Sequence, residues 1–184
     1  MGAVISTTFA AELPSGESLA LKTVSPLAME ADTRAVLLFF VAPDCPISNR
    51  YAPTLARIGA DAAKHGIKTW LVYADDLADP GNIRTHQTNY ALDLPTVIDR
   101  TFAIADFAGA NVTPEAALFV FRNDEQIPQL VYRGRIDDQY QGFGRYRPAA
   151  THSELTHALE QIAAGEIPAQ VITKAIGCYL PRAQ

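Results

Sequence analysis

One stretch of the chain, residues 36–53, constrains the fold more than any other. It begins with the apolar run from Val36 to Val41, which has the length and the β-branched and aromatic content of a buried strand. A short turn then leads to Cys45 and Pro46. Proline suits the first turn of a helix, because the N–H that it lacks has no partner there. The order predicts a central strand followed by a helix with Cys45 at its N-cap.

The predicted position of Cys45 has a chemical consequence. Unpaired N–H groups and the helix dipole at a helix N-terminus favour a thiolate over a thiol. The neighbouring Asp44 opposes this ionisation, so the helix terminus must outweigh the carboxylate for the pKa to fall. Many free cysteines are simply buried. A cysteine between an apolar strand and a helix-starting proline is nevertheless a candidate nucleophile or metal ligand.

The rest of the sequence alternates between helical and extended patterns. A long helix is expected from Ile47 onwards, with Pro53 inside it and a stop at Gly66. Further helices are expected at 79–90, at 100–108 and after a capping box at 151–154. Strands are expected at 19–24, 67–73, 117–121 and 130–133, the last two forming a hairpin around the turn 123–125. This alternation predicts an α/β fold.

Residues 44–53 resemble the active site of the thioredoxin-like superfamily, where a strand is followed by Cys-x-x-Cys and a helix. Cys45 stands at the first cysteine position, and Pro53 matches the helix proline eight residues later. Ser48 stands where thioredoxins have the second cysteine, so the motif is Cys-Pro-Ile-Ser. The wording is similar to that of bacterial redoxin-domain proteins, a group between the AhpC/TSA-like peroxiredoxins and the thiol–disulfide oxidoreductases.

A second block supports the resemblance. Thr113 and Pro114 precede the apolar strand at 117–121, as the cis-proline of thioredoxin-like folds precedes a strand and faces the active cysteine. The resemblance covers roughly residues 15–180 and implies a thioredoxin-like α/β fold, with a central mixed β-sheet flanked by helices. It also implies that the backbone at Thr113 and Pro114 binds an extended substrate beside Cys45.

We expect a single domain, because 184 residues fit one core and 48% of them are hydrophobic. The expected boundaries are an N-terminal extension at 1–17, a redoxin domain at 18–165 and a C-terminal tail at 166–184 that carries Cys178. The first residues lack the basic segment of a complete signal peptide. The compartment stays open, with an extracytoplasmic location slightly favoured over the cytoplasm.

The serine at position 48 changes the expected mechanism. A second cysteine would resolve a mixed disulfide by attacking it, and a serine hydroxyl is too weakly acidic for that step. Cys178 is the candidate replacement, provided that its Cα comes within about 7 Å of the Cα of Cys45. The leading hypothesis is a thiol–disulfide oxidoreductase with Cys45 as nucleophile, Ser48 beside it and Cys178 as the candidate resolving cysteine.

Two other functions stay open. A thiol peroxidase would oxidise Cys45 to a sulfenic acid that condenses with Cys178. Peroxiredoxins carry Thr or Ser three residues before this cysteine and Pro four residues before that, where this chain has Ala42 and Leu38. A non-enzymatic copper-binding module would need Cys45, Cys178 and His86 to converge. His86 also fits an ordinary half-buried helix position.

Composition limits the partners. The net charge is -5 and no basic run is present, which argues against nucleic acid. No apolar stretch reaches the roughly 20 residues that span a bilayer. The expected partners are a protein or small-molecule disulfide, or a peroxide, as substrate, and a thiol as electron donor. No cofactor and no metal is expected for the leading hypothesis.

Overall fold

A computed structural model describes residues 13–122 and 127–182, and in these residues it contains one eight-stranded sheet. The strands follow the order β11-β8-β7-β3-β4-β5-β1-β2. Their bounds are β1 (Gly16–Glu17), β2 (Thr23–Val24), β3 (Ala35–Phe40), β4 (Ile67–Tyr73), β5 (Thr96–Ile98), β7 (Glu115–Val120), β8 (Gln129–Gly134) and β11 (Val171–Ile172). The helices in the described residues are α1 (Pro46–Ala63), α2 (Pro80–Tyr90), α3 (Ala103–Ala108) and α4 (Glu154–Ala163). None of these helices is long and apolar enough to cross a bilayer.

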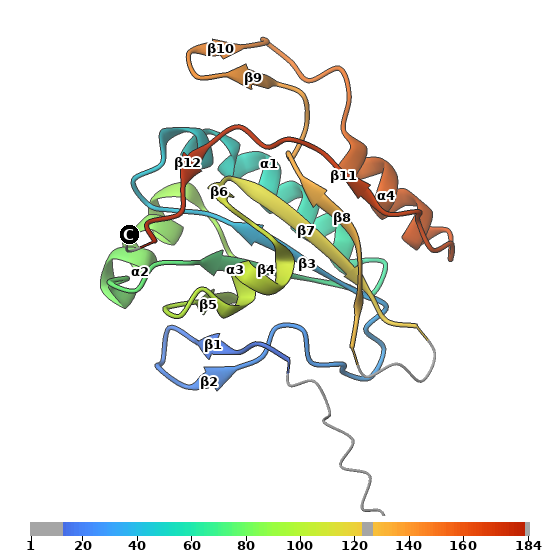
Figure 1. Cartoon of the computed structure of the whole chain (residues 1–184), viewed down its shortest axis with the longest axis horizontal. Helices are drawn as coiled ribbons and strands as arrows, with labels where there is room; N and C mark the ends of the chain where they lie inside the picture. Colours follow the sequence, from blue (N-terminus) through green and yellow to red (C-terminus); the bar gives the residue numbers. More distant parts are fainter. Residues whose placement is uncertain (1–12, 123–126, 183–184) are drawn as a thin grey trace, which may run out of the picture.

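Strand β3 lies at the centre of the sheet because all of its residues are apolar and buried. It pairs in parallel with β4 on one side and antiparallel with β7 on the other. The sheet is therefore mixed, and helices flank it, as Figure 1 shows. The expected α/β fold with a central mixed sheet is confirmed.

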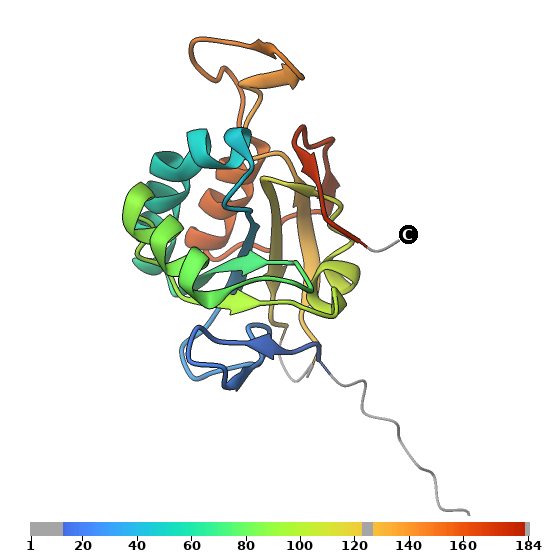
Figure 2. The same ribbon diagram turned by 90° about the vertical axis from the view of Figure 1, so that its left-hand side faces the viewer.

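The helices form two layers, one on each face of the sheet. Leu37 and Phe39 of β3 belong to the apolar cluster that α1, α2 and α4 complete. Val36 and Leu38 belong to the cluster on the opposite face, which includes α3. This division follows from the alternation of side chains along a strand. Figure 2 shows α1, α2 and α4 on one side of the sheet and α3 on the other.

The starts of α1, α2 and α4 are capped by side chains that accept backbone N–H groups. Cys45 is the N-cap of α1 in an extended conformation, and Pro46 is the first helical residue, as predicted. Helix α4 differs from the expected capping box, because Ser153 rather than Thr151 is its N-cap. The Ser153 hydroxyl accepts the N–H of Thr156 at 3.2 Å. Thr151 instead bonds a carboxylate of the preceding loop.

The strand predicted at 19–24 is wrong. The chain forms a short antiparallel hairpin there from β1 and β2. Leu21 lies in the turn between them with a φ of 57°, in the left-handed region that interrupts a strand. The hairpin predicted further along the chain is confirmed as the antiparallel pair β7 and β8. Its predicted turn at 123–125 lies outside the described residues.

The predicted domain boundaries stay predictions, and the structure adds contacts across both of them. Most of the expected extension at 1–17 lies outside the described residues, but β1 at its end pairs with β5. In the expected tail at 166–184, β11 lies parallel to β8. Beyond it, β12 (Cys178–Tyr179) pairs antiparallel with β6 (Val112–Thr113). A separate hairpin, β9 (Tyr140–Gly142) with β10 (Arg145–Tyr146), projects away from the sheet in Figure 1.

Candidate active site

Cys45 lies where the chain leaves β3 and enters α1. Its Sγ accepts the backbone N–H of Ser48 at 3.4 Å, one of the N–H groups that have no partner inside the helix. Only 1% of the residue is exposed. The predicted N-cap position of the thiol is confirmed, and the sulfur meets the helix N-terminus directly.

The strand before Pro114 lies against this thiol. The peptide bond between Thr113 and Pro114 is cis, as the resemblance implies. The protonated Cys45 donates to the Thr113 carbonyl oxygen, with 3.0 Å between sulfur and oxygen. The structure therefore brings together three of the predicted site residues. Cys45 comes from the start of α1, Thr113 from β6, and Pro114 from the link between β6 and β7.

A carboxylate that the sequence analysis missed holds β6 in place. Glu115 is 4% exposed, and its Oε2 accepts the backbone N–H groups of Asn111 at 2.9 Å and Val112 at 3.3 Å. Burial raises the pKa of Glu115, while these hydrogen bonds and the charge of Arg133 oppose the rise. A glutamate directly after a cis-proline carries no sequence pattern that would reveal this contact.

The C-terminal tail brings Cys178 to the same place. In the β12–β6 pairing, Cys178 lies opposite Thr113. Gly177 makes this approach possible, because a Cβ there would lie 2.1 Å from the carbonyl oxygen of Thr113. Both thiols are free. The tail thus lies over the nucleophile position and presents the second thiol to Cys45.

The two thiols shift each other's pKa in opposite directions. Burial raises the pKa of Cys45, but hydrogen bonds from the Cys178 thiol and the Ser48 N–H outweigh it, and the pKa is lowered from its ordinary value. Burial, the hydrogen bond to Cys45 and the charge of Cys45 raise the pKa of Cys178 to about 12. Near neutral pH, Cys45 is therefore the thiol that ionises first.

Ser48 contacts the Cys45 sulfur through its backbone, and its hydroxyl bonds the preceding turn. Its N–H donates to Cys45, whereas its Oγ accepts the N–H of Ala42 at 3.4 Å. The residue is 2% exposed. The hydroxyl therefore links the turn before Cys45 to the first turn of α1, which holds the thiol in register with the helix N-terminus.

His86 is a buried helix residue that supports the turn before Cys45. Its Nδ1 lies 2.8 Å from the Tyr73 hydroxyl, and its Nε2 lies 2.8 Å from Oδ1 of Asn49. Asn49 in turn donates to the carbonyl oxygen of Pro43 at 2.9 Å. Burial lowers the pKa of His86. Both ring nitrogens are occupied, so this histidine is neither a free base nor a free ligand.

The copper-binding alternative requires a cluster of ligands. Within residues 13–122 and 127–182, no group of three His, Cys, Asp or Glu side chains is arranged to hold a metal ion. The two cysteines meet, but His86 is engaged by Tyr73 and Asn49. The convergence of Cys45, Cys178 and His86 that this alternative needs is not found in the described part of the chain.

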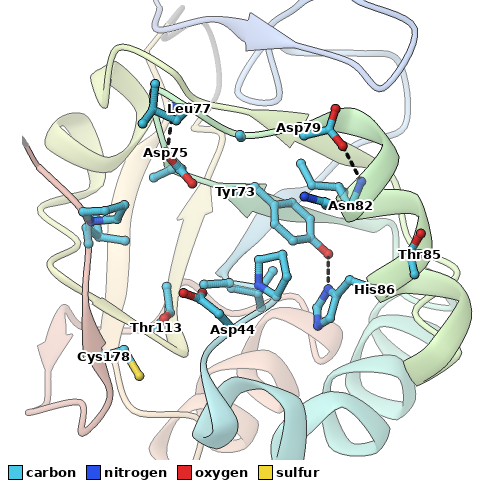
Figure 3. Close-up of a pocket in the computed structure, with 18 of the residues that line it drawn as sticks. Asp44, Tyr73, Asp75, Leu77, Asp79, Asn82, Thr85, His86, Thr113 and Cys178 are labelled. Atoms are coloured by element: carbon cyan, nitrogen blue, oxygen red, sulfur yellow. Dashed lines mark hydrogen bonds between the residues drawn. The ribbon is translucent and has the colours of Figure 1, made fainter.

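A cavity of about 670 Å³ opens beside the thiol pair. Figure 3 shows it between the loops after β3 and β4, helix α2 and the tail. Thr113 and Cys178 line it, whereas Cys45 does not. Tyr73 and His86 form part of its wall. Of the two cysteines, Cys178 is therefore the one that borders this space.

A thiol at a helix N-terminus, facing a cis-proline on a central mixed sheet, is the arrangement of the thioredoxin-like class. The AhpC/TSA family model matches residues 8–129, more than half of the chain, and the chain belongs to this family. Together the fold and the family support a redox function and bear out the expected resemblance to redoxins. No curated protein matches the sequence.

Solved structures share the fold. A hypothetical protein from Sinorhizobium meliloti superposes with a TM-score of 0.73 at 20% identity, covering 92% of this chain and 90% of that protein. A thiol-disulfide oxidoreductase from Bacteroides fragilis gives 0.54 at 19% identity, covering 66% and 88%. A secreted disulfide oxidoreductase from Mycobacterium tuberculosis gives 0.52 at 15% identity, covering 83% and 96%. At these identities the likeness shows a common thioredoxin-like fold.

Proposed function

We propose that the protein is a thiol–disulfide oxidoreductase in which Cys45 is the nucleophile and Cys178 the resolving cysteine. The observation that carries the proposal is the β12–β6 pairing, which sets Cys178 opposite Thr113 while the Thr113 carbonyl contacts Cys45. The substrate is a disulfide and the electron donor is a thiol. Family membership supports redox chemistry of this kind.

The first step is attack by the Cys45 thiolate on one sulfur of a substrate disulfide. The Cys45–sulfur bond forms, the substrate S–S bond breaks, and the second substrate sulfur leaves as a thiolate that takes up a proton. Cys178, as thiolate, then attacks Sγ of Cys45. The mixed disulfide breaks and releases the first substrate sulfur. The substrate has gained two electrons, and the protein holds a Cys45–Cys178 disulfide.

The order of the two steps follows from the charges. While Cys45 is a thiolate, its charge and hydrogen bond help to keep Cys178 protonated. Once Cys45 is in a mixed disulfide it no longer carries that charge, so two of the causes that raise the pKa of Cys178 are removed. Cys178 therefore becomes a better nucleophile only after the first step has occurred.

A trapping experiment tests the proposal. Reduced wild-type protein mixed with one equivalent of cystamine should yield the Cys45–Cys178 disulfide and two equivalents of cysteamine. The Cys178→Ser variant should stop at a mixed disulfide on Cys45, and mass spectrometry of alkylated peptides distinguishes the products. The oxidised wild type should also unfold at higher temperature than the reduced protein, because closing a loop of over 100 residues stabilises by about 5 kcal/mol in the chain-entropy model.

One result would contradict the proposed role of Cys178. If Cys178→Ser turns over a disulfide at the wild-type rate without added thiol, Cys178 has no part in the mechanism. The peroxidase alternative, which family membership favours, is tested in parallel with hydrogen peroxide. Position 42, where peroxiredoxins carry a hydroxyl, is an alanine here, and its N–H already bonds Ser48. We therefore expect slow peroxide consumption relative to disulfide reduction.

A further inference from the structure

The cavity beside the thiol pair determines which molecules reach the redox centre. Cys45 is 1% exposed and does not line the cavity, whereas Cys178 does. A molecule in the cavity therefore lies beside Cys178 and not beside Cys45. Access is one of the factors that decide which sulfur of a disulfide is attacked.

Leaving-group chemistry favours attack at the same sulfur. Attack on Cys178 expels Cys45, and the thiol with the lower pKa leaves faster. When the other cysteine is held in a mixed disulfide, the Ser48 N–H still lowers the pKa of Cys45, whereas burial and the charge of Asp44 still raise the pKa of Cys178. The Ser48 N–H at the start of α1 remains in place to receive the departing thiolate. Both access and leaving-group stability point to Cys178.

The cavity lining is acidic. Asp44, Asp75 and Asp79 line it, and its lining contains no Lys or Arg. Asp75 and Asp79 each use one oxygen to accept a backbone N–H, at 2.8 Å, but both carboxylates remain at the cavity in Figure 3. His86 does not offset them, because burial lowers its pKa and both ring nitrogens are hydrogen-bonded. Such a lining repels anions and concentrates cations.

A second feature marks the inner end of this cavity. Thr113 lines it beside Cys178, and its hydroxyl has no hydrogen-bond partner among the described residues. The residue is only 2% exposed. A buried hydroxyl without a partner is costly, and such groups call for an explanation. A polar ligand that reaches Cys178 arrives next to this hydroxyl.

The tail excludes large partners from the other approach. An extended polypeptide binds a sheet by pairing with an exposed strand edge. The edge of β6, beside Cys45, is already paired with β12 of the tail. Gly177 packs against the Thr113 backbone so closely that no space remains between the two segments. While the tail is docked, only a molecule that fits the cavity can reach the pair.

We propose that the cavity binds a small thiol that carries an amino group and no net negative charge, and that this thiol reduces the Cys45–Cys178 disulfide by attacking Cys178. The inference rests on the proposed function. The donor thiolate forms a bond to Sγ of Cys178, the protein S–S bond breaks, and Cys45 leaves as a thiolate. A second donor thiol attacks the donor sulfur of the mixed disulfide, which releases Cys178 and the oxidised donor. Two thiols supply the two electrons.

Reduction of the isolated disulfide form tests the charge selection. Cysteamine, 2-mercaptoethanol and mercaptoacetate serve as cationic, neutral and anionic probes, with rates normalised to thiolate concentration. At low salt, cysteamine should react at least about tenfold faster than mercaptoacetate, and added salt should narrow the gap. The double variant Asp44→Asn/Asp75→Asn should lose most of this preference. Asp93→Asn, an exposed carboxylate outside the cavity lining, should keep it.

Acid quenching within the first turnover tests the point of attack. The donor should be found on Cys178, with Cys45 free. Equal rates for the three probes, or a donor found on Cys45, would overturn this inference and leave the proposed function standing. If no Cys45–Cys178 disulfide forms in the first place, the proposed function fails and takes this inference with it.

Discussion

Gly177 gives the sharpest test of how the tail controls the site. In the Gly177→Val variant, the new Cβ would lie 2.1 Å from the Thr113 carbonyl oxygen and 2.6 Å from the Thr113 carbonyl carbon. Both are backbone atoms, so no side-chain rotation relieves the clash. Overpacking of this kind costs about 1–3 kcal/mol. The simplest relief is for β12 to leave β6.

Besides the β12–β6 pairing, an ion pair between Arg182 and Asp106 at 2.6 Å holds the tail. Tyr179 is 80% exposed, and the apolar anchor next to it is Leu180, which is 7% exposed and donates its N–H to the Asn111 carbonyl at 3.0 Å. A loss of about 1–3 kcal/mol corresponds to a fall of about 5- to 150-fold in the docked population relative to the undocked one. Closure of the Cys45–Cys178 disulfide should slow accordingly, because it requires the docked tail.

Two assays measure the effect. Closure is followed by quenching with an alkylating agent after a stoichiometric oxidant is added, and protection of Cys45 is followed by its alkylation with iodoacetamide. Gly177→Val should close more slowly and expose Cys45 to faster alkylation. Lys174→Val is the control, because it adds the same side chain at an exposed tail position. A Gly177→Val protein that closes at the wild-type rate, with Cys45 still protected, would refute the reasoning.

Three further predictions follow from the same geometry. Ser48→Cys should form a 45–48 disulfide, detectable by mass spectrometry, and so gain insulin-reductase activity with dithiothreitol; unpaired thiols under mild oxidant would contradict the helix N-cap geometry. Glu115→Ala should lower the free energy of unfolding in urea by about 1–3 kcal/mol, because the part-buried N–H groups of Asn111 and Val112 lose their charged acceptor; Glu115→Gln, which keeps one acceptor oxygen, should lose less. In the docked wild type, the slow alkylation of Cys45 should level off at a lower pH than that of Cys178, because the pKa of Cys45 is lowered from its ordinary value whereas that of Cys178 is raised to about 12; equal pH midpoints would contradict this assignment.

The parts of the site that lie close together in the sequence were predictable from it. The apolar run of β3 and the Cys-Pro pair that follows it determine where the strand ends and the helix begins, so the N-cap position of Cys45 needs only local rules. The resemblance supplied the cis-proline at Pro114. The role of each residue in the site was harder to predict from the sequence than its position. Ser48 acts through its N–H, and no sequence pattern separates a backbone donor from a side-chain one.

The parts that depend on distant segments were not predictable. Gly177 has no positive φ and marks no turn; its need to be glycine comes from a backbone in another part of the chain. His86 likewise takes its role from hydrogen bonds to groups on other elements. Glu115 differs, because it bonds N–H groups only a few residues before it, and no turn motif in the sequence marks that contact. The strand predicted at 19–24 was wrong because a local apolar pattern alone suggested it. In the structure these residues form a turn at Leu21 and the strand β2 of the β1–β2 hairpin.

The two cysteines differ in how readily they ionise because the backbone around them differs. Cys45 occupies a helix N-cap, where the Ser48 N–H is free to stabilise a thiolate. Cys178 lies in a strand paired with β6, where burial raises the pKa of its thiol. Exchanging the roles would require a thiolate at β12 with no helix terminus to stabilise it. In the proposed mechanism the tail therefore supplies the second thiol without competing for the first ionisation, and no second cysteine is required at position 48.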